Sequence, residues 1–63
     1  MSLAEKFIGL TKKDAQNKAD MCNLIFRLIR IDEKSFQSYP EDDRDDRICV
    51  EIDKQEITKA IIK

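Results

Sequence analysis

The 63-residue chain contains no histidine, one glycine, one proline and two cysteines. Cys22 and Cys49 form no CxxC pair, and without histidine neither a zinc site nor a Cys–His nucleophile is expected. Two reduced thiols are the favoured interpretation, with a single disulfide as the alternative. One glycine and one proline exclude a flexible linker, so we expect residues 1–63 to form one domain without metal or cofactor.

Long apolar segments are also missing. No apolar run reaches the roughly 18 residues of a membrane span, and the N-terminus lacks the basic, apolar and small-residue order of a secretory signal. The chain as written therefore predicts a cytoplasmic protein with no membrane partner, and secretion stays open if a signal has been removed. The 12 basic and 13 acidic residues give a formal net charge of -1, which offers no reason to expect a nucleic-acid partner.

Catalysis is not expected either. Paired carboxylates can act as general acid and base, but so short a chain without histidine or an evident concave pocket has little means of shifting a carboxyl pKa. We therefore predict that the protein is not an enzyme.

A helix is predicted after Gly9 and Leu10. Thr11 is the expected N-cap, with Asp14 three residues later as in a capping box, and Asn23 is the expected stop because it tolerates the left-handed conformation. Small side chains at helical spacing would let this helix lie close to a sheet: Ala15, Ala19 and Cys22.

Three strands follow. The β-branched run Leu24–Ile31 predicts a central strand, with Phe26 and Leu28 facing the helix. Ile29 and Ile31 would lie on the opposite face, covered by residues 35–39 or by a second copy of the protein. A second strand, residues 47–52, alternates between an inward set of Ile48, Val50 and Ile52 and an outward set of Arg47, Cys49 and Glu51.

A polar turn at residues 53–56 then leads to a last strand, residues 57–62, which should pair antiparallel with its predecessor. The predicted fold class is α+β, with one helix packed on a small sheet.

The connection from Asp32 to Asp46 has no periodic pattern and is long for so small a domain. Its two aromatic residues and its proline argue against disorder. Three interpretations stay open: a recognition loop, a solvated acidic turn that protects a sheet edge, or a calcium site, although two arginines interrupt the acidic cluster. The connection contains seven of the 13 acidic residues: Asp32, Glu33, Glu41, Asp42, Asp43, Asp45 and Asp46.

The order of these elements is similar to that of the potato inhibitor I type of serine protease inhibitors, the group of the barley subtilisin inhibitor and eglin with its small bacterial relatives. Phe7-Ile8-Gly9-Leu10-Thr11 with Ala15 resembles the Val-Gly-x-Ser/Thr helix start of that family, and Phe26-Arg27-Leu28-Ile29-Arg30 resembles its next strand. The most specific match is Asp43-Arg44-Asp45-Asp46-Arg47-Ile48-Cys49-Val50-Glu51-Ile52-Asp53, which is similar to the family's Tyr-Arg-x-Asp-Arg-Val/Leu-x-Val-x-Val-Asp.

The resemblance implies a mixed sheet with the long exposed loop strung between two parallel strands. It also implies that this loop crosses a protease active site as an extended, substrate-like strand, braced from below by arginines. The position that enters the specificity pocket would be Glu41, with the scissile bond before Asp42, and the bracing arginines would be Arg44 and Arg47. The expected protease-binding residues are Tyr39, Pro40, Glu41, Asp42 and Asp43.

The chain departs from this family at three positions. The family places an apolar residue where Glu41 stands, Thr or Val at Pro40, and a second bracing arginine at Cys49. A carboxylate without a partner in an apolar pocket costs a few kcal/mol, so a protease partner is expected to have a basic pocket selective for Glu or Asp.

The alternative function is a non-inhibitory interaction or structural module of the same fold. Such a module would hold a basic protein through the acidic loop, or form a homodimer through the apolar strand face at Ile29 and Ile31.

Overall fold

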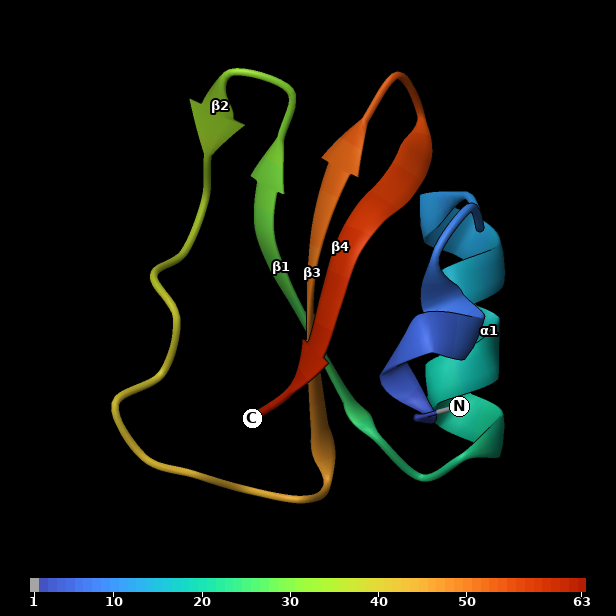
Figure 1. The fold of residues 1–63 in the computed structure, drawn as a ribbon, viewed down its shortest axis with the longest axis vertical. Helices are drawn as coiled ribbons and strands as arrows, with labels where there is room; N and C mark the ends of the chain where they lie inside the picture. Colours follow the sequence, from blue (N-terminus) through green and yellow to red (C-terminus); the bar gives the residue numbers. More distant parts are fainter. Residues whose placement is uncertain (1) are drawn as a thin grey trace.

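The structure is a computed structural model that describes residues 2–63, in which one α-helix packs against one face of a four-stranded sheet (Figure 1). The sheet order is β2-β1-β3-β4, with β1 and β3 parallel and the two outer pairs antiparallel. The predicted α+β fold with a mixed sheet is therefore confirmed. The elements are a 3₁₀ turn η1 (Ala4–Phe7), α1 (Lys12–Met21), β1 (Ile25–Ile31), β2 (Lys34–Ser35), β3 (Arg47–Asp53) and β4 (Glu56–Ile62).

Local sequence signals set both ends of α1. The Thr11 hydroxyl accepts a hydrogen bond from the Asp14 backbone N–H at 3.3 Å, as predicted for the N-cap. At the other end Asn23 has φ 56°, and the N–H groups of Asn23 and Leu24 donate to carbonyls of the last helical turn at 3.1 and 2.8 Å. This pair of hydrogen bonds is a Schellman motif, which provides donors for carbonyl groups at the end of the helix.

The helix packs through small residues, although one predicted member of that set is wrong. Ala15 and Ala19 are buried against the sheet, whereas Cys22 is exposed because it caps the helix where the chain turns away. Both cysteines are free thiols, Cys22 at the surface and Cys49 in the interior.

The apolar core lies between α1, η1 and the sheet. Ile48, Val50 and Ile52 are at most 2% exposed, as the alternation in β3 predicts, and Ile57 joins them from β4. Phe7 of η1 is fully buried in the same cluster. Among residues 2–63, no helix combines the length and apolar composition needed to cross a membrane.

A β-bulge in β1 places Ile31 on the face opposite to the predicted one. Leu28 pairs with Val50 but Arg30 pairs with Glu51, so the register shifts at Ile29. Ile31 consequently packs against the same core as Leu28, and its predicted place on the opposite face is wrong. Ile29 is 7% exposed and lies outside the core cluster, and its carbonyl accepts the N–H groups of residues 36 and 37 at 2.9 and 3.2 Å.

Two tight turns complete the sheet. Lys54 and Gln55 have φ of 51° and 70° between the paired residues Asp53 and Glu56, as a type I′ hairpin requires, so the predicted turn and the antiparallel β4 are confirmed. The short strand β2 follows a turn at Asp32, φ 52°, and is not predicted from the sequence, where the whole connection lacks a strand pattern.

Candidate functional site: an anchored acidic loop

Residues 36–46 connect β2 to β3 without regular secondary structure. Figure 1 shows this segment, in yellow to light orange, on the side of the sheet opposite α1. We call that side of the sheet the loop face and residues 36–46 the acidic loop. The loop face carries the outward side chains of β3, because successive residues of a strand point to opposite faces.

The first half of the acidic loop is attached to three strands. Arg27 of β1 donates from Nε to the Ser38 carbonyl at 3.0 Å. The Tyr39 hydroxyl donates to a Glu51 carboxylate oxygen on β3, and the Lys59 ammonium of β4 lies 5.4 Å from the centre of the Tyr39 ring. Pro40 is buried, so its ring faces the protein rather than solvent.

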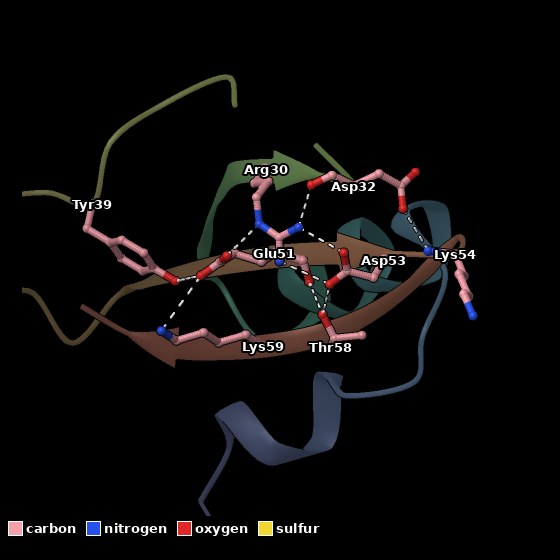
Figure 2. A network of polar contacts seen from close by, with 8 residues as sticks. All are labelled: Arg30, Asp32, Tyr39, Glu51, Asp53, Lys54, Thr58 and Lys59. Atoms are coloured by element: carbon pink, nitrogen blue, oxygen red, sulfur yellow. Dashed lines mark hydrogen bonds and ion pairs between the residues drawn. The ribbon is translucent and has the colours of Figure 1, made fainter. Parts of the chain in front are cut away.

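A polar network under Tyr39 holds Glu51 in place, as Figure 2 shows. Arg30 Nε donates to Glu51 at 2.8 Å, and the guanidinium also binds both carboxylate oxygens of Asp53 at 2.8 and 3.0 Å. The Thr58 hydroxyl adds a hydrogen bond of 2.6 Å to Asp53. The network therefore links side chains of β1, β3 and β4 beneath the loop.

Hydrogen bonds and burial in this network shift the pKa values of its ionisable groups. The hydrogen bond from Tyr39, followed by that from Arg30, lowers the pKa of Glu51, and the hydrogen bonds from Arg30 and Thr58 lower the pKa of Asp53 to about 2. Burial, and then the adjacent Glu51 carboxylate, raises the pKa of Tyr39. Tyr39 is thus a protonated donor and Glu51 an ionised acceptor at neutral pH.

The second half of the loop is held by Arg47 and Lys63. Arg47 Nη2 donates to the side chain and the carbonyl of Asp42 at 3.0 and 3.3 Å, and to the Lys63 carbonyl at 2.6 Å. The Lys63 ammonium pairs with Asp43 at 2.8 Å, and the Lys63 carbonyl also accepts the Arg44 N–H at 3.1 Å. The Arg47 side chain is only 11% exposed, and its hydrogen bond lowers the pKa of Asp42.

The two predicted bracing arginines therefore differ. Arg47 reaches the predicted protease-binding segment at Asp42, whereas the Arg44 guanidinium pairs with Asp46 within the loop, at 2.7 and 2.8 Å. That pairing lowers the pKa of Asp46. Within residues 2–63, the Arg44 side chain forms no hydrogen bond or ion pair with residues 39–43, so its pairing with Asp46 constrains only the end of the loop.

Glu41 stands between the two anchored halves. Its side chain is exposed, and no hydrogen bond or ion pair within residues 2–63 engages its carboxylate. Both neighbours are constrained, Pro40 by burial and Asp42 by Arg47. Of the two acidic side chains in the loop without a partner in the described part of the chain, Glu41 and Asp45, Glu41 is therefore the one that lies within residues 39–43, on a backbone held on either side.

Sequence reasoning missed Arg27, Lys59 and Lys63 as loop supports. Arg27 pairs in register with Cys49, the position where the resemblance implies a second bracing arginine. Arg27 thus reaches the loop from the strand next to Cys49, while Cys49 itself is buried and burial raises the pKa of its thiol. The alternation of β1 could have placed Arg27 on the loop face. In β4, alternation from the buried Ile57 would place Lys59 on the core side, and the register shift between Glu51 and Ile52 moves it to the loop face.

Comparisons with models of protein families, with curated proteins and with solved structures give no match for this chain. Within residues 2–63, no cluster of three or more His, Cys, Asp or Glu side chains has an arrangement that could hold a metal ion.

Proposed function

We propose that this protein is a serine protease inhibitor-like domain that presents residues 39–43 to the protease as an extended, substrate-like segment. The observation that carries the proposal is the free Glu41 carboxylate between two halves of a loop that strand side chains hold from below.

Preorganisation is the physical basis of this function. A loop already fixed at Ser38, Tyr39 and Asp42 loses little conformational entropy when a protease binds it, so more of the contact energy appears as affinity. If the bond between Glu41 and Asp42 is cut, the upstream end stays attached through Arg27 and Glu51, and the downstream end through Arg47. Retained ends keep the protease occupied, and they favour religation over release.

The charge of Glu41 sets the expected partner. A protease with a basic specificity pocket would pair with this carboxylate, whereas an apolar pocket would leave it desolvated at a cost of a few kcal/mol. The partner is therefore a protease that cleaves after Glu or Asp.

The alternative of a module that binds a basic protein through the loop has less support. Of the five acidic residues between Glu41 and Asp46, three already have a basic partner within the chain: Asp42 with Arg47, Asp43 with Lys63, and Asp46 with Arg44. Internal pairing reduces the negative charge that a basic partner could use.

A panel of serine proteases that includes a Glu-selective enzyme tests the proposal. The protein should inhibit the Glu-selective enzyme, with slow cleavage only after Glu41 and with the complex retained. Glu41→Gln should weaken that inhibition by about tenfold or more, because the charge-assisted contact is lost. Glu41→Leu should redirect the inhibitor toward enzymes with apolar pockets.

Asp45→Asn is the matched control, because it removes one exposed acid from the same loop outside residues 39–43 and should leave inhibition unchanged. The proposal would be overturned if no protease in the panel were inhibited, or if the protein were cleaved rapidly at several sites.

A further inference from the structure

The β2 side of the sheet leaves half of β1 without a neighbour. β2 pairs only with Arg30 and Ile31 of β1. The last backbone contact on this side is formed by the N–H groups of residues 36 and 37, which donate to the Ile29 carbonyl. Along Ile25–Leu28, no strand of residues 2–63 lies on this side. We call this stretch the open edge of β1.

Backbone groups point outward along the open edge. The Ile25 N–H donates to the Asp46 carbonyl at 2.7 Å, so Ile25 and Arg27 direct their backbone groups toward β3. Phe26 and Leu28, which alternate with them, direct N–H and C=O away from β3. An unpaired row of this kind is a template for another strand.

Apolar side chains at this edge are only partly covered. Leu24, Phe26 and Leu28 pack against the core from one side yet stay partly exposed, and Ile25 on the loop face is 51% exposed. Beside them an open groove of about 480 Å³ separates the edge from α1, lined by Leu24, Ile25 and Phe26 on one side and by residues of α1 on the other. A strand added here would cover all four apolar side chains.

The opposite edge of the sheet is better protected. On β4, the Ile57 N–H and C=O are bonded to Leu10 and Gly9, each at 2.8 Å, and η1 packs beside them. The 3₁₀ turn thus covers part of the β4 edge, whereas nothing equivalent within residues 2–63 covers β1.

We propose that the open edge binds a second copy of this chain, with β1 antiparallel to β1 across a twofold axis at Phe26. The charge pattern favours this register over one with the axis at Arg27. An axis at Arg27 would place two arginines directly opposite each other, whereas an axis at Phe26 places Arg27 opposite Ile25 of the second copy. Leu24 then faces Leu28, and Phe26 faces its own equivalent, so partly covered apolar side chains meet each other.

The length of the pairing is limited on both sides. At the start of β1, the chain comes from α1 through the turn at Asn23, which has φ 56°. Beyond Leu28, residues 36 and 37 already bind the Ile29 carbonyl. The Leu24 N–H is already bonded to the Ala19 carbonyl at 2.8 Å, so backbone pairing over Leu24–Leu28 is incomplete at Leu24. The small interface fits a weak, concentration-dependent dimer. The twofold axis is perpendicular to the sheet, so both acidic loops lie on the same face and could engage two partners at once.

Sedimentation velocity from about 10 μM to about 1 mM tests the dimer and its register. Ile25→Lys places a charge opposite Arg27 and should raise the dissociation constant by about fivefold, because two equivalent cross-strand pairs change together. Ile25→Glu should lower it by a similar factor. This reversal of sign with charge would not follow from a change in folding alone.

Ile61→Lys is the matched control, since Ile61 is a 39% exposed isoleucine on the same face of the opposite edge strand and should leave the dissociation constant unchanged. Circular dichroism and urea unfolding show that each variant is folded. A wild-type protein that stays monomeric at about 1 mM, or a dimer weakened by Ile61→Lys and not by Ile25→Lys, overturns the proposal.

Discussion

The two faces of the sheet are built from the same strands by different chemistry. In β3, Ile48, Val50 and Ile52 face α1 and are almost completely buried, whereas Arg47 and Glu51 face the acidic loop and are fixed by ion pairs and hydrogen bonds. Apolar burial is non-directional and supplies most of the folding free energy, while charged contacts are directional and individually weak. The helix face therefore stabilises the fold, and the loop face determines the shape of the loop.

The largest expected effect comes from the helix face. Ile48→Ala should lower the free energy of unfolding by about 2–5 kcal/mol, because it removes buried methyl groups and leaves a cavity in a small core. Urea unfolding followed by circular dichroism measures this loss. Ile61→Ala on the loop face should cost much less, because Ile61 is already partly exposed, and equal losses would contradict the contrast between the faces.

Acid should weaken the polar network on the loop face through Asp53. The folded protein lowers the pKa of Asp53 from 3.8 to about 2, so this group stabilises the fold fully above its ordinary pKa, and the contribution disappears as the pH falls through about 2. The free energy of unfolding should therefore decrease below about pH 4. Unfolding curves collected at a series of pH values measure the slope.

Asp53→Asn is the control for this acid effect, because the amide does not titrate in that range. The variant should show a flatter dependence of stability on pH between about 4 and 2. An unchanged slope would mean that Asp53 is not the group responsible.

Arg47→Ala should affect the conformation of the loop more than the free energy of unfolding of the whole protein. The change removes the bonds to Asp42 and to the Lys63 carbonyl, so amide hydrogen exchange in residues 41–46 should accelerate by about tenfold or more. Global stability should fall by only about 1 kcal/mol, because the apolar core is untouched. Equal protection of the loop amides in variant and parent would rule out bracing by Arg47.

The smallest effect is expected from Tyr39→Phe. Loss of the hydroxyl removes the leading cause of the lowered pKa of Glu51, which should rise toward its ordinary value of 4.5 while Arg30 still keeps it below that value. A carbon-detected NMR titration of the Glu51 carboxyl measures this change. A Glu51 pKa that does not move would show that the hydroxyl contributes nothing to the network.

Local signals were sufficient to predict the helix and the last hairpin. The Thr11 cap, the left-handed Asn23 and the turn at residues 54–55 act within a few residues, and the structure has all three. The bulge at Ile29 could not be predicted in this way, because it depends on the register between β1 and β3. That single shift moves Ile31 into the core and brings Arg30 opposite Glu51.

The residues that support the loop also differ in how far they lie from it in the sequence. The resemblance implies Arg47, which lies five positions from its loop partner, but Arg27 and Lys63 lie 11 and 20 positions from theirs. No local pattern connects residues at such separations. Only strand pairing places Arg27 beside Cys49 and carries Lys63 back to Asp43.

The amino-acid sequence by itself determined where the helix and long strands form, which face of β3 is apolar, and that an acidic loop joins two of the strands. It could do so because capping, turn geometry and hydrophobic alternation act over short distances along the chain. Tertiary structure decided which charges lie beneath the loop and which edge of the sheet is open. It also decided that, within residues 2–63, Glu41 is the one acidic residue of the segment 39–43 that is exposed and unpaired. These properties depend on strand order and register, which bring distant residues within hydrogen-bonding distance.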